Sequence, residues 1–406
     1  MTSTHADLLL GSPLGRDLLA GYVGLGSLTG GLGDRLGLGL PPGTARLTAV
    51  QAGRRSRRPA VRAAARFRNL LEHRQRYREQ IQRSREWDSG WRQVPADRVR
   101  DAVRAAVAGS PWRAELAAAD GFSLLAGLSG STDNFGFSGQ DEALWALTAV
   151  AAAELRPVAE EFAAQAEAAG WWAPADLTAQ RFTAWDGSPR LANGELDRRI
   201  RDDMAAERAD NASRGPRPPE KEGVRYGACW WSAPPFAEVS WTTPAAGPLP
   251  AVSAAGFFDT GIPCPDCTGA DILAVEIDPA ARVAEINGPD DWRDLTATYP
   301  RDVTGTHDGE WRYWGGVPGP WRLPDWERVR DDYDGVHVSP GGYVTSCGLA
   351  QPADGACTML VAWLPGATLW LHDVITGTGL LGRWDGTGPE VMASLDRDLP
   401  QWHPAS

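Results

Sequence analysis

The sequence contains very little lysine and little sulphur. Lys221 is the only lysine among 40 basic residues, and the 406 residues include five cysteines and four methionines. So few cysteines in a chain of this length exclude a small fold held together by disulfides. Abundant alanine, glycine and arginine beside scarce lysine is typical of coding in a GC-rich genome, which says nothing about activity.

Long hydrophobic runs are also missing. No run reaches the ~18 apolar residues that a membrane-spanning helix needs. The run Leu8–Leu10 is short and follows no basic residue, so it does not have the form of a secretion signal. With 43% hydrophobic and 23% charged residues, the chain has the composition of a soluble globular protein. We therefore expect a cytoplasmic protein with no membrane contact.

Charge is distributed unevenly along the chain. The net charge is −12, yet residues 54–113 carry 17 arginines against six acidic residues. Such a stretch is typical either of nucleic-acid binding or of a solvated helix face that docks on the acidic remainder of the chain. It lacks interleaved aromatic residues and a glycine-rich RNA-binding signature. We therefore do not expect a nucleic-acid partner.

Hydrophobic periodicity divides the chain into two parts. Residues 1–170 form a mostly helical domain with basic helices, and its periodic segments predict helices over 60–85, 95–108 and 141–170. Residues 171–406 form an α+β domain with a split sheet whose turns are rich in the 46 glycines and 31 prolines. The strands are predicted at 180–185, 225–232, 271–286, 335–339, 358–364 and 368–374, and the helices at 195–208, 289–299 and 324–332. Residues 211–223 are the best candidate for a linker.

Common catalytic and metal-binding motifs are absent. The sequence has no phosphate-binding glycine loop, no GxSxG and no HExxH. Cys264 and Cys267 form half of a zinc site, which Cys347 and Cys357 complete only if the fold brings the two pairs together. The other interpretation is a turn that carries two thiols. We therefore expect no metal, zinc included.

Tryptophan is the most abundant aromatic residue, with 19 copies against seven tyrosines and nine phenylalanines. Several of them gather in residues 304–326, beside His307. In a glycine- and proline-rich loop, such rings suit the walls of a cleft that stacks a flat ligand. The alternative is a loop held on the core by its own rings. The first interpretation makes His307 a catalytic candidate and assigns substrate binding to Trp311, Trp314 and Trp326.

His337 lies in a short predicted strand, 335–339. Strand alternation places it with Gly335 and Ser339, on the less apolar face. There it is either a general acid or base or a structural histidine whose hydrogen bonds are satisfied.

Four segments of the second part follow one another in a characteristic order. They are Gln180-Arg181-Phe182, Trp230-Trp231-Ser232-Ala233-Pro234, the strand–turn–strand segment 272–286, and Tyr333-Asp334-Gly335-Val336. Together they resemble the corresponding motifs of ADP-ribosyltransferases. The resemblance implies a split sheet around an extended NAD, which is the substrate. It implies that Arg181 binds the pyrophosphate, that Ser232 orients the ribose and that Trp231 stacks on the nicotinamide. Residues 304–326 are also similar to segments of actinobacterial proteins.

The chain departs from this family at the catalytic glutamate. The sequence after Tyr333 offers Asp334 and His337 instead, so we expect these two residues to stabilise charge or to activate the acceptor. The leading hypothesis is thus NAD-dependent ADP-ribosyl transfer to a small-molecule or a protein or peptide acceptor. The alternatives are a tailoring enzyme of specialised metabolism that does not use NAD, and a binding protein with a tryptophan-lined groove for a peptide or aromatic ligand. The sequence leaves the acceptor and the oligomeric state open.

Overall fold

The computed structural model describes ten stretches of the chain. These are residues 4–25, 35–36, 93–119, 124, 139–186, 191, 194–214, 231–244, 269–385 and 401–405. The predicted helix over 60–85, most of the basic stretch, the Cys264–Cys267 pair and the linker beyond Arg214 lie outside the described residues. No described helix is long and apolar enough to cross a membrane.

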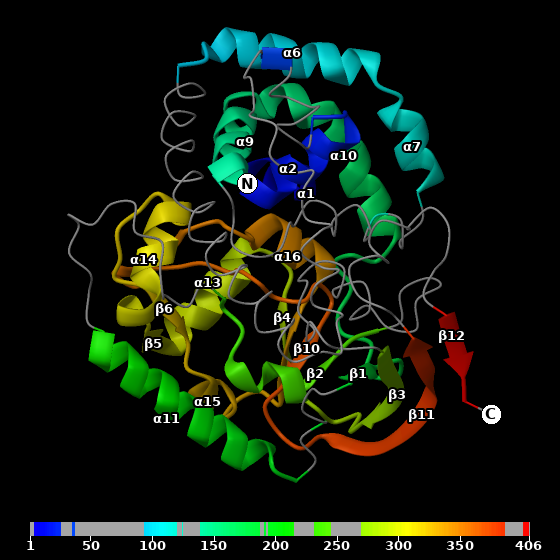
Figure 1. The fold of residues 1–406 in the computed structure, drawn as a ribbon, viewed down its shortest axis with the longest axis vertical. Coiled ribbons are helices and arrows are strands. Elements are labelled where there is room, and N and C mark those ends of the chain that lie inside the picture. The colour runs from blue at the N-terminus through cyan, green and yellow to red at the C-terminus, as the bar shows by residue number, and fades with distance from the viewer. Residues whose placement is uncertain are drawn as a thin grey trace, which may run out of the picture.

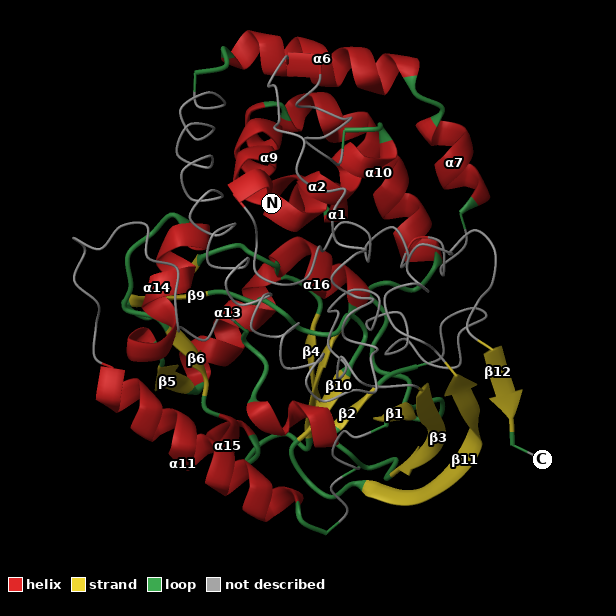
Figure 2. Ribbon diagram, viewed as in Figure 1, coloured by secondary structure: helices red, strands yellow, loops and turns green. Residues whose placement is uncertain are grey.

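Helices fill the first part of the chain (Figures 1 and 2). They are α1 (His5–Gly11), α2 (Pro13–Tyr22), α6 (Ala96–Gly109), α7 (Trp112–Ala118), α9 (Gly139–Val150) and α10 (Ala152–Ala168). In α6 the buried side chains Val99, Val103 and Ala106 recur at helical spacing, which is why the sequence predicted this helix well. The predicted helix over 141–170 is in fact two helices. The two helices meet at Ala151, and Pro157 lies inside the second of them.

Two four-stranded sheets form the second part of the chain, as the split-sheet prediction requires. One has the order β1-β3-β11-β12, built from β1 (Arg181–Trp185), β3 (Gly269–Ile277), β11 (Ile375–Asp385) and β12 (Gln401–Pro404). The other has the order β2-β10-β7-β4, built from β2 (Trp241–Thr242), β10 (Thr368–Trp370), β7 (Gly335–Val338) and β4 (Val283–Ile286). Arg181 and Thr243 join the sheets through two backbone hydrogen bonds of 2.7 and 2.9 Å. The fold class is α+β.

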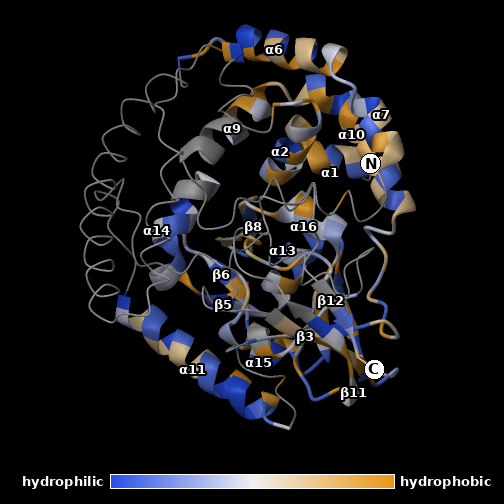
Figure 3. Ribbon diagram, turned by 45° about the vertical axis from the view of Figure 1, so that its right-hand side comes forward, coloured by the Kyte–Doolittle hydropathy of each residue, from blue (hydrophilic) through white to orange (hydrophobic). Residues whose placement is uncertain are grey.

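Helices and short strands surround the second sheet. The helical elements are α11 (Leu196–Arg214), η2 (Pro235–Val239), α13 (Pro289–Thr298), α14 (Thr304–Gly315), α15 (Trp326–Val329) and α16 (Pro340–Ser346). The two small hairpins are β5 (Pro300–Asp302) with β6 (Arg322–Pro324), and β8 (Gln351–Ala353) with β9 (Ala356–Thr358). The exposed helix α11 is largely hydrophilic and buries only a narrow stripe, Leu196, Ile200 and Met204 (Figure 3).

The helical part and the sheet part share one hydrophobic core. The Ser12 hydroxyl caps α2 and also donates to the Val344 carbonyl of α16 at 2.7 Å. The helix α16 thus connects the helices to the sheet, because it follows β7 directly and is capped by Ser339. The proposed boundary between the two domains at residue 170 stays a prediction.

The tryptophan-rich segment differs from its prediction. Residues 304–315 form the helix α14, which ends at Gly316 in the left-handed conformation (φ 67°). Trp311 packs edge-on against Trp321, with 5.3 Å between ring centroids, and Trp326 packs against Trp363 at 6.0 Å. All four rings are buried. The burial of Trp311 and Trp326 favours the alternative, in which the segment's own rings hold it on the core. Their assignment to substrate binding stays a prediction.

Candidate active site

A row of polar side chains crosses the second sheet. Glu285 on β4 pairs with His337 on β7, His337 pairs with Thr368 on β10, and Thr368 pairs with Thr242 on β2. Directly paired residues project to the same face of a sheet, so these four side chains form one row. The opposite face carries Val336, Val338 and Leu369 and belongs to the hydrophobic core. We call the four residues the polar row.

Glu285 and His337 form a close hydrogen bond within this row. The distance from His337 Nδ1 to Glu285 Oε2 is 2.6 Å, and the histidine is only 5% exposed. The second carboxylate oxygen, Oε1, accepts the Ala175 N–H at 3.0 Å, which holds the carboxylate in place. Because the carboxylate accepts from Nδ1, a neutral imidazole at this position presents its lone pair at Nε2. No hydrogen bond to Nε2 occurs in the described part of the chain.

Thr242, at the other end of the polar row, forms hydrogen bonds within the protein. Thr242 Oγ1 donates to Gln180 Oε1 at 2.6 Å and accepts the Trp370 indole N–H at 2.8 Å. Gln180 in turn donates to the Asp176 carbonyl at 2.8 Å. The segment 175–180 therefore contacts both ends of the row, Glu285 through Ala175 and Thr242 through Gln180.

Thr368, between His337 and Thr242, has no such partner. It is fully buried, and its Oγ1 makes no hydrogen bond to any residue that the structure describes. A buried hydroxyl without a partner costs about 1–3 kcal/mol of stability. The other three members of the row all form side-chain hydrogen bonds, so Thr368 alone among the four carries this cost.

The predicted NAD-binding residues have different environments. Arg181 begins β1 and is half-buried, with Nη1 donating to its neighbour's carbonyl, Gln180 O, at 2.9 Å. Ser232 is buried, donates to Met359 O at 2.8 Å and accepts the Val361 N–H at 2.8 Å. With both hydrogen bonds made inside the protein, the Ser232 hydroxyl anchors a loop.

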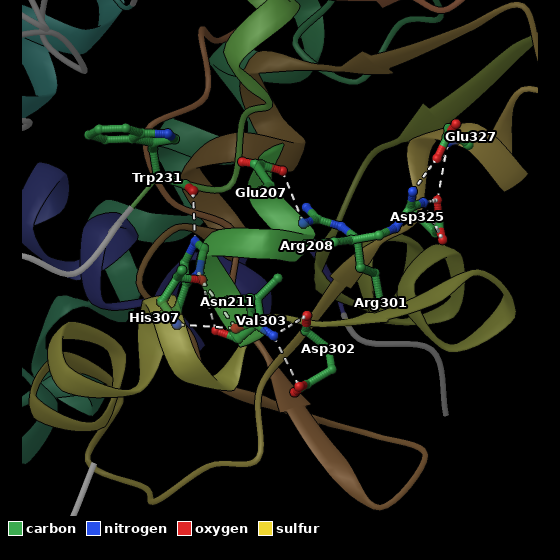
Figure 4. Close-up of polar contacts among 11 residues, drawn as sticks. Glu207, Arg208, Asn211, Trp231, Arg301, Asp302, Val303, His307, Asp325 and Glu327 are labelled. Atoms are coloured by element: carbon green, nitrogen blue, oxygen red, sulfur yellow. Dashed lines mark hydrogen bonds and ion pairs between the residues drawn. The ribbon is translucent and has the colours of Figure 1, made fainter. Parts of the chain in front are cut away.

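His307 anchors the backbone next to Ser232 (Figure 4). It lies on α14, is 2% exposed, and its Nε2 donates to the Trp231 carbonyl at 3.2 Å while Nδ1 accepts from the Thr306 hydroxyl at 2.9 Å. Burial lowers the pKa of His307 to about 4. The histidine is thus neutral and structural. The Trp231 ring is 41% exposed and extends away from His307 (Figure 4).

A polar network fixes α11 beside this histidine (Figure 4). Asn211 Oδ1 accepts the Thr306 N–H at 3.2 Å, and its Nδ2 donates to the Asp302 carbonyl at 3.1 Å. Arg301 is buried and forms an ion pair with Glu207 at 2.9 Å, although burial raises the pKa of Glu207. These contacts hold α11 against the residues that precede His307.

The Asp334 carboxylate is bound by Arg282 and has a structural role. Burial raises its pKa, but the hydrogen bonds and the ion pair with Arg282 outweigh this and hold the pKa below its ordinary value. Its carboxylate accepts the Arg282 backbone N–H at 2.8 Å and the side-chain Nε at 3.2 Å. The carboxylate thus fixes the start of β7, two residues before the strand's histidine.

The remaining predicted residues do not enter the polar row. Trp311 and Trp326 belong to the core, and the Trp314 side chain lies outside the described part. Within the described residues no three His, Cys, Asp or Glu side chains cluster as a metal site would require. Of the nine predicted site residues, His337 is the one that the structure places in the row, and Arg181 adjoins it through Gln180 and Thr242.

Sequence reasoning missed Glu285, Thr368 and Gln180. The signal for Glu285 was weak: an acidic residue in the otherwise apolar run Val283–Ile286.

The chain matches no protein-family model, and comparison with curated proteins and with solved structures gives no significant match.

Proposed function

We propose that the chain is an enzyme in which His337 and Glu285 transfer a proton. The observation that supports this proposal is the 2.6 Å hydrogen bond between a buried imidazole and a carboxylate that is itself held by a backbone N–H. Glu285 keeps the proton of the neutral ring on Nδ1, so Nε2 acts as the general base. Glu285 also stabilises the imidazolium that forms when Nε2 takes up a proton.

We further propose NAD as the substrate and ADP-ribosyl transfer as the reaction. Support comes from the sequence resemblance, from the split sheet, and from the position of Arg181 where the two sheets meet. Arg181 would bind the pyrophosphate and the exposed ring of Trp231 would stack on the nicotinamide. Ser232 takes no part in this scheme, because its hydroxyl is already saturated.

The reaction requires a base but no redox partner. The acceptor's nucleophilic atom attacks C1′ of the nicotinamide riboside, and its proton passes to His337 Nε2. The C1′–N bond breaks, and its electron pair leaves with neutral nicotinamide. The acceptor is a small molecule or a protein or peptide.

We place the reaction in the cytoplasm, where thiols such as those of Cys347 and Cys357 stay reduced.

The test is nicotinamide release from NAD by the wild type and by His337→Gln. General base catalysis is worth about 10²–10⁴-fold, so we expect His337→Gln to lose at least about a hundredfold in kcat. His403→Gln, at an exposed position of β12, is the matched control and should keep the wild-type rate. Equal rates for wild type and His337→Gln would exclude the proposed role of His337.

Binding of NAD is tested separately by calorimetric titration. Arg181→Ala should weaken NAD binding by about ten- to a hundredfold, since a charge-assisted hydrogen bond is worth about 1.5–3 kcal/mol. Arg181→Lys should recover little, because an ammonium group does not reproduce the planar fork of arginine. No binding at millimolar NAD would exclude NAD as the substrate.

A second candidate is proton-transfer chemistry on another small molecule, without NAD. The saturated Ser232 hydroxyl favours it, because one of the three contacts expected for NAD is taken by the protein itself. The same His337–Glu285 pair would then act on a tailoring substrate of specialised metabolism. Absent NAD binding together with a retained His337–Glu285 hydrogen bond would favour this candidate.

A further inference from the structure

Thr368 and His337 form a close pair across β10 and β7. On one side of them Val338 N donates to Ala367 O at 3.1 Å, and on the other Leu371 N donates to Asp334 O at 2.9 Å. In an antiparallel ladder the hydrogen-bonded and non-hydrogen-bonded pairs alternate, so His337 and Thr368 form a non-hydrogen-bonded pair. The Cα atoms of such a pair are about 4.5 Å apart, and the side chains approach more closely than in the other kind.

Both side chains of this pair have an unused hydrogen-bonding atom. Among the residues that the structure describes, neither the buried Thr368 Oγ1 nor His337 Nε2 has a hydrogen-bond partner. The neighbours on either side supply none in the described structure: Thr242 bonds to Gln180 and Trp370, and Glu285 bonds to His337 and Ala175. Two unused atoms on one face, on directly paired residues, point to a ligand that uses both.

We propose that Thr368 Oγ1 and His337 Nε2 together bind one hydroxyl group, the nucleophile of the reaction. A hydroxyl donates to the Nε2 lone pair and accepts the Thr368 proton, so it satisfies both atoms. A protonated amine or a guanidinium has no lone pair to accept from Thr368, and a carboxylate would lie near the charge of Glu285. The identity of the reaction rests on the proposed function, whereas the hydroxyl subsite rests on the geometry of the two residues.

This assignment gives Thr368 a positioning role. Its hydroxyl would hold the attacking oxygen while His337 Nε2 takes the proton, C1′–O forms, and C1′–N breaks with its electron pair leaving on nicotinamide. The nucleophile is then either water, which gives ADP-ribose, or the hydroxyl of an acceptor. A bound hydroxyl would also give the buried Thr368 Oγ1 the hydrogen-bond partner that it lacks among the described residues.

The first test compares Thr368→Val with Thr368→Ser in the nicotinamide-release assay. Valine keeps the shape and removes the hydroxyl, so we expect a loss of about ten- to a hundredfold in kcat with a melting temperature equal to or above that of the wild type. Serine keeps the hydroxyl and should retain most of the rate. Ser346→Ala is the matched control, because the buried Ser346 hydroxyl, on α16 outside the polar row, likewise has no partner in the described part of the chain. It should keep the wild-type rate.

Failure of this inference differs from failure of the proposed function. If His337→Gln loses the rate and Thr368→Val keeps it, the hydroxyl subsite is wrong and the role of His337 stands. If the wild type releases no nicotinamide, the NAD proposal is wrong, and the subsite is decided by a high-resolution crystal structure. We expect a water within hydrogen-bond distance of both Thr368 Oγ1 and His337 Nε2 in the wild type and its loss in Thr368→Val. A wild-type crystal without that water would overturn the subsite.

Product analysis distinguishes the two sources of the hydroxyl. Free ADP-ribose as the sole product, with oxygen from ¹⁸O-labelled water in its C1′ hydroxyl, identifies water as the nucleophile. A rate that rises with an added polyol, together with an ADP-ribosylated polyol as product, identifies an acceptor hydroxyl. A product joined through nitrogen would overturn the assignment.

Discussion

Acidification is expected to destabilise the fold through His307. The folded-state pKa is lowered by burial from the ordinary 6.5 to about 4, and the ring is nearly inaccessible to solvent. Below pH 6.5 the unfolded chain therefore binds a proton that the folded chain does not. The contribution of the neutral histidine is complete above pH 6.5 and is lost as the pH falls toward 4.

The size of this effect follows from the shift. One pKa unit corresponds to about 1.4 kcal/mol, so the 6.5-to-4 shift amounts to about 3.5 kcal/mol at most. His307→Gln is a suitable reference, because the glutamine amide can still donate to the Trp231 carbonyl but does not titrate. Carboxylates that also titrate contribute equally to both proteins and cancel in the comparison.

Urea unfolding of wild type and His307→Gln at pH 7.5, 5.5 and 4.5 measures the difference. We expect the stability of the wild type relative to the variant to be nearly constant above about pH 6.5 and to fall by about 2.5 kcal/mol by about pH 4.5. A difference that does not change with pH would show that His307 titrates normally. It would refute the structural role assigned to this histidine.

Three further substitutions test the fold around the polar row. Ser232→Ala should cost about 1–3 kcal/mol, because it removes two buried hydrogen bonds and leaves the Val361 N–H without its partner, and denaturant unfolding measures the loss. Trp311→Ala should lower the unfolding free energy by about 3–5 kcal/mol, since the ring is fully buried, and a larger effect on ligand binding than on stability would contradict its place in the core. Gly342→Ala should prevent folding, because its Cβ would lie 2.0 Å from the Ile286 carbonyl oxygen, and a native circular dichroism spectrum would contradict this close approach.

Local patterns predicted the elements but not their pairing. The sequence predicted a helix over 95–108 and the structure has α6 at Ala96–Gly109, because valines at helical spacing form its buried stripe. Strand alternation likewise predicted that His337 lies in a strand and on its more polar face. Helix periodicity and strand alternation both depend on residues that are close together in the sequence, so they can be predicted without knowing the tertiary contacts.

The partners of the site residues could not be predicted in this way. Glu285 meets His337 across 52 positions of sequence, through a parallel pairing of β4 and β7 that no local pattern specifies. The partners of Ser232 lie 127 and 129 positions away, so a hydroxyl that looked available in the sequence is saturated in the fold. The tryptophan-rich segment was misjudged because its glycines suggested a loop, whereas Gly315 and Gly316 end a helix.

A double-mutant cycle in nicotinamide release tests the central claim that His337 and Glu285 act as one unit. We expect His337→Gln to cost at least about a hundredfold in kcat, Glu285→Gln to cost about ten- to a hundredfold, and the double variant to be no slower than His337→Gln alone, because the carboxylate acts only through the imidazole. Losses that multiply in the double variant would show that the two side chains contribute independently. That result would contradict the account of Glu285 as the residue that positions the base.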